Sequence, residues 1–300
     1  MIIKYINKDN YNTVNDVLIN EFQFSSRLMS KLIKNKKIYL NNSFCDTRKS
    51  INYNDEIVVD LSGKENNSNI VATNMDLDII YEDDWFLVVN KQPGIAVHPS
   101  SLHYSDSLSN GVKFYFDKIG LKKKIRVVNR LDYNTSGIVV FAKCEYIHEQ
   151  FSKQMMQHIF QKEYLCIING FLDNSYGIID LPIDRKQGSI IERCIDKNGQ
   201  KSITHYEVLK TFSDYSLVKC ILETGRTHQI RVHFSAIGHP LLGDTLYGTA
   251  SDLINRQALH SNKIDLIHPI TKEHLSFESL LPNDMNNNPR VKPVDFHIGL

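Results

Sequence analysis

The sequence predicts a mixed α+β protein with a small N-terminal module and a larger, sheet-rich domain. Runs rich in β-branched and aromatic residues outnumber the stretches with helical periodicity. Strands and helices do not alternate regularly and no glycine-rich phosphate loop occurs, which disfavours a nucleotide-cofactor fold. A polar, asparagine-rich segment at residues 63–75 separates the first part from the rest, and a chain of 300 residues suits about two domains.

The N-terminal module is predicted over residues 1–62. Thr13 can cap a helix over residues 14–22, and Ser25 or Ser26 can cap a second helix. The second helix places a set of apolar residues on one face, namely Leu28, Met29, Leu32 and Ile33. A strand at residues 37–40, a polar turn at 41–43 and a strand at 56–61 complete the unit, and residues 63–76 form a linker that could act as a hinge.

The larger domain is predicted over residues 77–300, with long antiparallel runs. Strands are expected at residues 79–81, 86–90, 137–142, 163–169, 202–209 and 215–223. Helices are expected at residues 108–118, 144–156 and 227–237, the last of them capped by Thr227.

Composition limits the class of protein and its partners. Lys and Arg number 35 against 34 Asp and Glu, so the net charge is +1 and any surface that binds nucleic acid must be local. No stretch has the roughly 18 apolar residues of a membrane span, and residues 1–10 lack the features of a secretion signal. The five cysteines form no CxxC pair, which indicates reduced thiols and a cytoplasmic protein.

The second helix of the module is strongly basic. Arg27, Lys31 and Lys34 lie on it, which could be no more than a solvated face or could bind RNA. Two helices, a basic face and a hairpin over residues 14–61 resemble the ribosomal-protein S-four type of RNA-binding domain. This resemblance rests on the pattern of elements more than on a motif.

Residues 125–137 (IRVVNRLDYNTSG) place one acid between two apolar runs. Asp132 follows Arg130 in a predicted turn and precedes a strong strand, so its side chain is placed to project into a cleft. The alternative is an aspartate whose side chain bonds its own backbone in an Asx-turn.

Residues 223–248 (ETGRTHQIRVHFSAIGHPLLGDTLYG) combine a glycine stop, a helix and a glycine-rich turn. Arg231 lies on the first turns of that helix, from which a guanidinium could bind a carboxylate in bidentate geometry and keep it ionised. The alternative is a purely structural Arg–Asp pair.

These two segments are similar to the signature blocks of the RluA-type family of RNA pseudouridine synthases. Further blocks agree, at residues 90–99 (NKQPGIAVHP), 256–260 (RQALH), 268–271 (HPIT) and 280–282 (LLP), so that the similarity spans residues 78–285. Several long blocks in the same order make chance agreement very improbable. One departure is Asn129, where many members have histidine.

The resemblance implies an α+β catalytic domain with a central mixed, mainly antiparallel sheet and a cleft across it. It assigns the role of nucleophile or base to Asp132, pairs this carboxylate with Arg231, and places Tyr164, from the KEY sequence at 162–164, against the uracil. Taken alone, Tyr164 would more often be a core residue. The reaction needs no redox step, metal or cofactor.

Five further basic residues near Asp132 are candidates for RNA contact. In related enzymes the arginine matching Arg130 helps fill the gap left by the flipped base, although a phosphate contact is the alternative. The remaining four could contact phosphates or form a solvated loop: Lys122, Lys123, Lys124 and Arg126.

The histidines do not have the spacing of a metal site. His228 and His233 are five residues apart and no cysteine accompanies them, so hydrogen-bonding roles are favoured.

Three functional hypotheses follow from the sequence. The favoured one is an RNA pseudouridine synthase, an isomerase whose partner is RNA, with large-subunit ribosomal RNA favoured, transfer RNA open, and neither a membrane nor a required protein partner indicated. The second is a non-catalytic RNA-binding or ribosome-assembly factor, which the presence of Asp132, Tyr164 and Arg231 disfavours. The third is a nucleoside glycosidase that releases free base.

Overall fold

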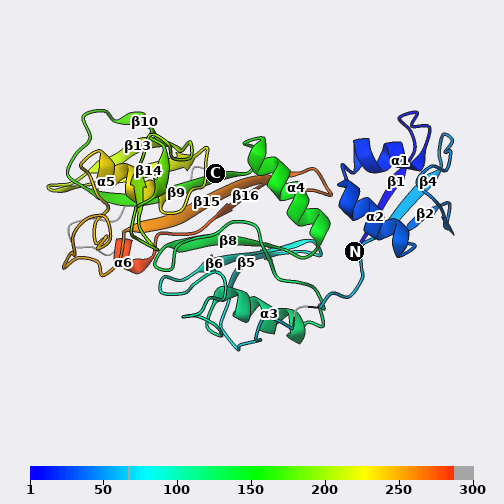
Figure 1. The fold of residues 1–300 in the computed structure, drawn as a ribbon, viewed down its shortest axis with the longest axis horizontal. Helices are drawn as coiled ribbons and strands as arrows, with labels where there is room; N and C mark the ends of the chain where they lie inside the picture. Colours follow the sequence, from blue (N-terminus) through cyan, green and yellow to red (C-terminus); the bar gives the residue numbers. More distant parts are fainter. Residues whose placement is uncertain (67, 287–300) are drawn as a thin grey trace.

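The computed structural model of the chain describes residues 1–66 and 68–286. A small N-terminal module stands beside a larger body built on a twisted, sheet-dominated α+β core (Figure 1). The fold class predicted from the sequence is therefore confirmed, including the small module and the mainly antiparallel sheet. Within the described residues no helix is long and apolar enough to cross a bilayer.

The module is an antiparallel sheet in the order β1-β4-β2-β3, covered by short helices. Its strands are β1 (Ile2–Ile6), β2 (Ile38–Leu40), β3 (Ser43–Phe44) and β4 (Glu56–Asp60). Its helices are α1 (Val14–Asp16), which continues into the π-helical turn η1 (Val17–Glu21), and α2 (Ser26–Lys34). Strand β1 was not predicted from the sequence, and the described structure shows it pairing along the whole of β4.

Side-chain caps start the helices of the module where the sequence predicts. The Thr13 hydroxyl accepts from the Asp16 amide at 3.3 Å while the Asp16 carboxylate accepts from the Thr13 amide at 2.9 Å, a reciprocal capping box. The Ser25 hydroxyl accepts from the Leu28 amide at 3.2 Å. Leu28 and Leu32 then face the core, as their helical spacing requires.

The body is a ten-stranded sheet in which β15 and β8 are the one parallel pair among the described strands. Its main path runs β10-β13-β14-β9-β15-β8-β6-β5, with β16 beside β15 and β7 beside β8. The strands are β5 (Asp78–Glu82), β6 (Phe86–Lys91), β7 (Arg126–Val127), β8 (Ser136–Ala142), β9 (Gln161–Asn169), β10 (Tyr176–Asp180), β13 (Ile203–Thr211), β14 (Tyr215–Leu222), β15 (Leu259–Ile267) and β16 (His274–Glu278). A separate hairpin joins β11 (Ile183–Arg185) to β12 (Arg193–Ile195), and α6 (Asn283–Asn286) follows the sheet.

Helices cover both faces of the central strands. α3 (Leu108–Lys118) and α5 (Gln229–Ala236) share one apolar cluster with Tyr164 of β9, whereas α4 (Glu145–Met156) packs in the cluster on the other face. All seven residues of β8 are buried, because a strand covered on both sides has no polar face. Every helix predicted for the body is present, with α3 at the predicted bounds.

A glycine allows the close pairing that fixes the start of β8. Gly137 has φ +112°, and a Cβ at this position would lie 2.2 Å from the carbonyl oxygen of Ser261 on β15. No other residue fits there without moving β15. The residues immediately before β8, which include Asp132, are thereby held against the middle of the sheet.

The module is docked on α4 of the body. The rings of Phe24 and Tyr146 meet edge to face with centroids 4.8 Å apart, and both residues are buried. The Ser25 hydroxyl donates to Glu149 at 2.8 Å and the Lys31 ammonium to Glu145 at 2.7 Å. These contacts hold the module in a fixed position beside the body (Figure 1).

The segment between module and body has no helix or strand in its described residues, 63–66 and 68–76. It is nevertheless tied to the body. The Glu65 carboxylate accepts two hydrogen bonds from the Arg126 guanidinium, at 2.7 and 2.8 Å, and the Thr73 amide donates to the carbonyl of Asn110 at 3.2 Å. The domain boundaries and the hinge role of the linker stay predictions.

Candidate active site

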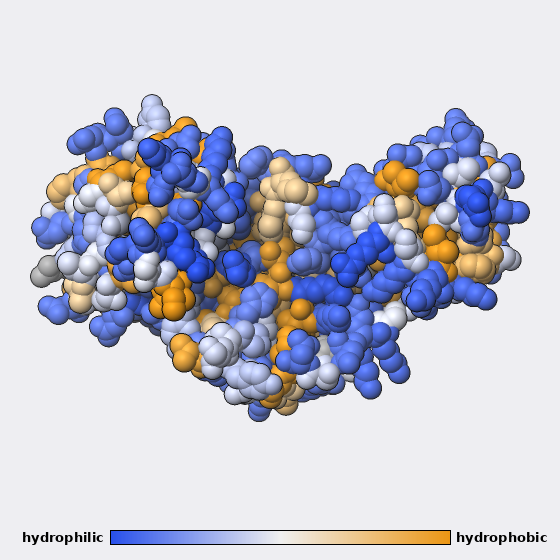
Figure 2. Space-filling view, in the orientation of Figure 1, coloured by the Kyte–Doolittle hydropathy of each residue, from blue (hydrophilic) through white to orange (hydrophobic). Residues whose placement is uncertain are grey.

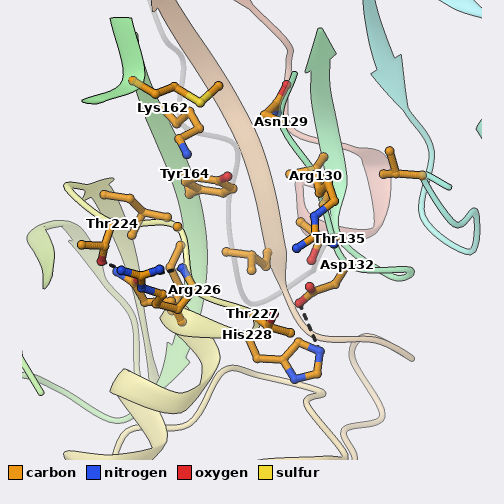
Figure 3. A pocket seen from close by; sticks show the side chains of 18 of the residues that line it. Asn129, Arg130, Asp132, Thr135, Lys162, Tyr164, Thr224, Arg226, Thr227 and His228 are labelled. Atoms are coloured by element: carbon orange, nitrogen blue, oxygen red, sulfur yellow. Dashed lines mark hydrogen bonds and ion pairs between the residues drawn. The ribbon is translucent and has the colours of Figure 1, made fainter. Parts of the chain in front are cut away.

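A cavity of about 1240 Å³ opens between the segment before β8, strand β9 and the turn that leads into α5. Asp132, Tyr164 and Arg130 line it, as do Lys162 and His228 (Figure 3). On the face of the molecule drawn in Figure 2, apolar surface gathers in a hollow at the middle, between hydrophilic surfaces on both sides. The fold therefore brings together residues that are far apart in the sequence.

Asp132 points its carboxylate into this cavity. The amide of Thr135 donates to the Asp132 carbonyl at 3.1 Å and closes the turn. Among the described residues, the carboxylate accepts from the Arg231 guanidinium and from no backbone amide, so the Asx-turn alternative is not what the structure shows. The side chain is left 25% exposed, toward the cavity.

A buried lysine supports the segment that carries Asp132. The Lys91 ammonium donates to the carbonyls of Gln92, Ile95 and Tyr133, each at 2.9 to 3.0 Å. Burial lowers the pKa of Lys91 to about 7, while the negative charge of Asp132 acts in the opposite direction. Three acceptors need three donors, which only the ammonium form offers, so we assign the charged form to this site. In the sequence this lysine belongs to the 90–99 block, which by itself indicates no role for it.

Arg231 is a buried cation shared by two carboxylates. Its guanidinium binds Asp244 in bidentate geometry, with Nε–Oδ2 and Nη2–Oδ1 distances of 2.7 and 2.8 Å. Its Nη1 donates to Oδ2 of Asp132 at 3.3 Å. Burial alone would lower the pKa of the Arg231 guanidinium. The interactions with Asp244 and Asp132 outweigh burial, so the pKa is raised.

The bidentate partner of Arg231 is thus Asp244 and not Asp132. The Asp244 side chain is fully buried and also accepts from the amides of Leu246 and Tyr247, at 3.0 and 3.2 Å. Sequence reasoning missed this residue, although the GD pair of the 223–248 block contains it. Asp244 fixes the guanidinium in place, and the remaining nitrogen then faces Asp132.

His228, for which the sequence favoured only a hydrogen-bonding role, lies beside Asp132. Its Nε2 lies 3.9 Å from Oδ2 of Asp132 (Figure 3). Its Nδ1 lies 2.8 Å from the Tyr247 hydroxyl. Burial lowers the pKa of His228, and the charge of Arg231 lowers it further against the effect of Asp132. The ring is therefore mostly neutral near pH 7.

The predicted cap of α5 is wrong. The helix begins at Gln229, and the capping position is His228, in the left-handed conformation with φ +59°, not Thr227. The Gln229 side chain accepts from the amide of Arg226 at 3.0 Å, so the turn is closed by an amide side chain. The unusual backbone of His228 turns its imidazole toward Asp132.

Tyr164 forms part of the cavity wall. The residue is only 6% exposed, and its ring reaches the cavity from β9. Burial raises the pKa of the Tyr164 phenol above its ordinary value, and the nearby charge of Asp132 raises it further. The phenol is therefore neutral at physiological pH, which suits a flat contact surface better than a base.

The predicted RNA-contacting residues divide into two groups. Six are exposed: Arg27, Lys31, Lys34, Lys122, Lys124 and Arg130. Of these, Lys31 lies within ion-pair distance of Glu145 and Glu65. Two predictions need correction, because Lys123 is buried and donates to the carbonyl of Leu61 at 2.7 Å, and Arg126 is mostly buried against Glu65.

His233 and the five cysteines do not line the cavity. His233 is buried between the Thr204 hydroxyl and the Leu181 carbonyl, each at 2.9 Å, in line with the hydrogen-bonding role favoured from the sequence. In residues 1–66 and 68–286 no cluster of three or more histidine, cysteine or acidic side chains is arranged to hold a metal ion. All five cysteines lie in this part of the chain and are free.

Comparison with known proteins places this site in a family. A model of the RNA pseudouridylate synthase family matches residues 85–236, which include Asp132, Tyr164 and Arg231. An uncharacterised RNA pseudouridine synthase of Bacillus subtilis is 38% identical over 267 residues, covering 89% of this chain and 94% of that protein. The ribosomal large subunit pseudouridine synthase D of Nitrosomonas europaea is 33% identical over 272 residues, covering 88% of this chain and 79% of that protein.

A solved structure agrees with this placement. The human RNA pseudouridylate synthase domain containing 1 superposes with a TM-score of 0.59 at 26% identity, over 71% of this chain and 87% of that one. Family model, relatives and fold thus coincide on the part of the chain that forms the cavity. The chain belongs to the RluA-type family of RNA pseudouridine synthases.

Proposed function

We propose that this RNA pseudouridine synthase acts on uridines of large-subunit ribosomal RNA, with Asp132 as the reacting carboxylate. The observation that carries the assignment is the position of Asp132, which faces a cavity and is held by a buried guanidinium. Tyr164 on the opposite wall offers a ring for the base. This arrangement suits a substrate with one flat group and one electrophilic carbon.

The reaction moves uracil from an N1–C1′ bond to a C5–C1′ bond. The N1–C1′ bond breaks with its electron pair passing to the uracil, while Asp132 either bonds to C1′ or removes the 2′ proton to give a glycal. The freed ring turns, C5 bonds to C1′, the carboxylate is released or the 2′ proton returns, and overall a proton moves from C5 to N1. Atoms and electrons balance without any co-reactant.

The neighbours of Asp132 have distinct parts in this chemistry. Arg231 donates a hydrogen bond to the carboxylate of Asp132, whose negative charge both routes use. Tyr164 holds the base by stacking, which tolerates rotation of the ring in its plane. Arg130 is exposed at the cavity wall, where it can fill the position that the flipped base leaves or contact a phosphate.

The N-terminal module is proposed to bind RNA as an S-four-type domain. Its helix α2 buries Leu28 and Leu32 while Arg27 and Lys34 stay exposed. Relatives named as ribosomal large subunit synthases support ribosomal RNA as the substrate. Transfer RNA is the competing substrate, and the cytoplasm is the proposed compartment, as the free thiols suit reducing conditions.

Incubation of the full chain with RNA transcripts tests this function. We expect chemical mapping to show pseudouridine at one or a few positions of large-subunit ribosomal RNA and none in transfer RNA. Modification of transfer RNA alone would refute the proposed substrate. RNA retention without any modified uridine would identify a non-catalytic binding or assembly factor, and release of free uracil would identify a glycosidase.

Lys122 and Lys124 are predicted to contact phosphates. Replacing both by Gln should make the negative slope of log affinity against log salt concentration less steep, by roughly 0.7–0.9 for each phosphate that is no longer neutralised. The rate at saturating RNA should not change, because neither side chain lines the cavity. Filter binding at several salt concentrations measures the slope. The matched control replaces the exposed Lys197 and Lys272, and equal slopes for both double variants would contradict the prediction.

A further inference from the structure

Lys162 is a partly buried cation that lines the cavity, and its ammonium has no partner among the described residues. It lies two residues before Tyr164 on β9, so both side chains leave the same face of the strand. Figure 3 shows its ammonium turned into the cavity toward the Tyr164 ring. No hydrogen bond or ion pair with any described residue involves this ammonium. Burial lowers the pKa of Lys162, as expected where no acceptor offsets the loss of water.

The lysines that are fully buried in the described structure all have partners, unlike Lys162. Lys91 donates to three carbonyls, and Lys143 donates to the Glu82 carboxylate at 2.7 Å. Lys113 pairs with Asp117. Buried charges without partners are rare because they reduce stability, and those that face a cavity tend to serve a ligand. The missing acceptor of Lys162 is therefore expected to come from the substrate.

We propose that Lys162 is a further catalytic residue, which donates a hydrogen bond to a carbonyl oxygen of the target uracil and stabilises the uracil anion when the N1–C1′ bond breaks. The inference rests on the proposed function and extends it. Bond cleavage places the electron pair on the ring, and the charge spreads over N1, O2 and O4. The ammonium keeps its proton throughout, and the charge disappears when C5 bonds to C1′ and N1 is protonated.

The position of Lys162 favours the base over a phosphate as its partner. A uracil stacked on Tyr164 would lie beside the ammonium, since the two side chains share a strand face. Phosphates stay nearer to solvent, where Arg130 and Arg226 are exposed at the cavity. A donor aimed at charge that develops only in the transition state accelerates the chemical step and leaves binding almost unchanged.

The test uses Lys162→Met and Lys162→Arg with single-turnover loss of the target nucleoside as readout. Each enzyme is given the same RNA with uridine or 5-fluorouridine at the target, because fluorine makes the ring a better leaving group. We expect Lys162→Met to slow the reaction of uridine by about 10²–10³-fold. The loss with 5-fluorouridine should be at least about tenfold smaller, because that leaving group needs less stabilisation. Lys162→Arg should recover part of the rate.

Two further measurements separate this role from others. The RNA dissociation constant should stay within about twofold, and the melting temperature of Lys162→Met should not fall, because the substitution removes a partly buried charge that has no partner. Lys263→Met is the matched control, since Lys263 lies on the neighbouring strand β15, outside the cavity, and is near Asp265 and Glu278 at 3.6 and 3.8 Å. We expect it to retain the full rate.

Several outcomes would overturn the inference. Equal losses with uridine and 5-fluorouridine would exclude stabilisation of the leaving group. Weaker RNA binding at an unchanged rate would assign Lys162 to a phosphate, and a lower melting temperature would assign it to the fold. If the unsubstituted enzyme forms pseudouridine and Lys162→Met is equally fast, the inference alone fails; if the unsubstituted enzyme modifies no RNA, the proposed function fails and the inference fails with it.

Discussion

Asp132→Asn should abolish pseudouridine formation while the protein keeps its fold and its affinity for RNA. An amide can neither attack C1′ nor remove the 2′ proton, and the loss of a reacting group of this kind is expected to cost at least about 10⁴ in rate. Stability should change little, because Arg231 keeps its two bonds to Asp244. Quantitative mapping of pseudouridine at the target position, after single turnover, measures the rate.

The matched control for this variant is an exposed acid outside the cavity. Asp252→Asn makes the same chemical change at a solvated position and should retain the full rate. RNA affinity and the melting temperature of both variants show whether each remains folded and able to bind. Turnover by Asp132→Asn within about a hundredfold of the unsubstituted enzyme would mean that another group reacts with the sugar.

Local patterns predicted most of the fold, and they failed where the chain departs from simple periodicity. α3 was predicted at its observed bounds from helical periodicity, and in the structure Ser107 stands at its N-cap. β15, by contrast, is central to the sheet but contains the buried polar residues His260 and Ser261, which hide its strand character. Its pairing with Gly137 depends on a contact between residues more than a hundred positions apart.

The site was predicted only in part for a related reason. The family resemblance supplied Asp132, Arg231 and Tyr164. In the structure Asp132 and Tyr164 line one cavity, and Arg231 does not line it but donates a hydrogen bond to Asp132. It did not supply the surroundings of Asp244 and Lys162. The types of neighbouring residues in the sequence do not reveal that Arg231 pairs with Asp244, 13 residues away. Nor do they reveal that the ammonium of Lys162 has no partner among the described residues.

The basic residues of 122–126 illustrate the same limit. Four positive charges in five residues predicted one exposed stretch, either in contact with RNA phosphates or forming a solvated loop. The side chains in fact diverge, so that Lys122 and Lys124 reach solvent while Lys123 and Arg126 bind inward to Leu61 and Glu65. Charge patterning in a sequence gives the number of cations but not the direction in which each one points.

Asp244→Asn should have the largest effect on stability. The substitution leaves the guanidinium of Arg231 buried without its bidentate carboxylate, which is expected to lower the free energy of unfolding by about 3–5 kcal/mol. Activity should fall as well, because Arg231 is no longer held toward Asp132. Urea unfolding measures the first effect, and single-turnover rates at low temperature, where the variant stays folded, measure the second.

Asp284→Asn is a closely matched control for this prediction. Asp284 binds Arg256 with the same bidentate geometry, at 2.6 and 2.9 Å, but its side chain is 40% exposed. Water can take over the hydrogen bonds of an exposed carboxylate, so we expect Asp284→Asn to lower the free energy of unfolding by no more than about 1 kcal/mol. Equal losses for the two variants would show that burial of the Arg231–Asp244 pair has no special importance.

Removing both charges of the buried pair separates its structural from its chemical role. Arg231→Met combined with Asp244→Leu removes both charges of the pair, and replacement of buried ion pairs by apolar groups of similar volume is often neutral or stabilising. The double variant should therefore recover most of the stability that Asp244→Asn loses. It should nevertheless remain inactive, because Asp132 no longer has its guanidinium neighbour. A stable and active double variant would show that Asp132 reacts without Arg231 and that the pair serves the fold alone.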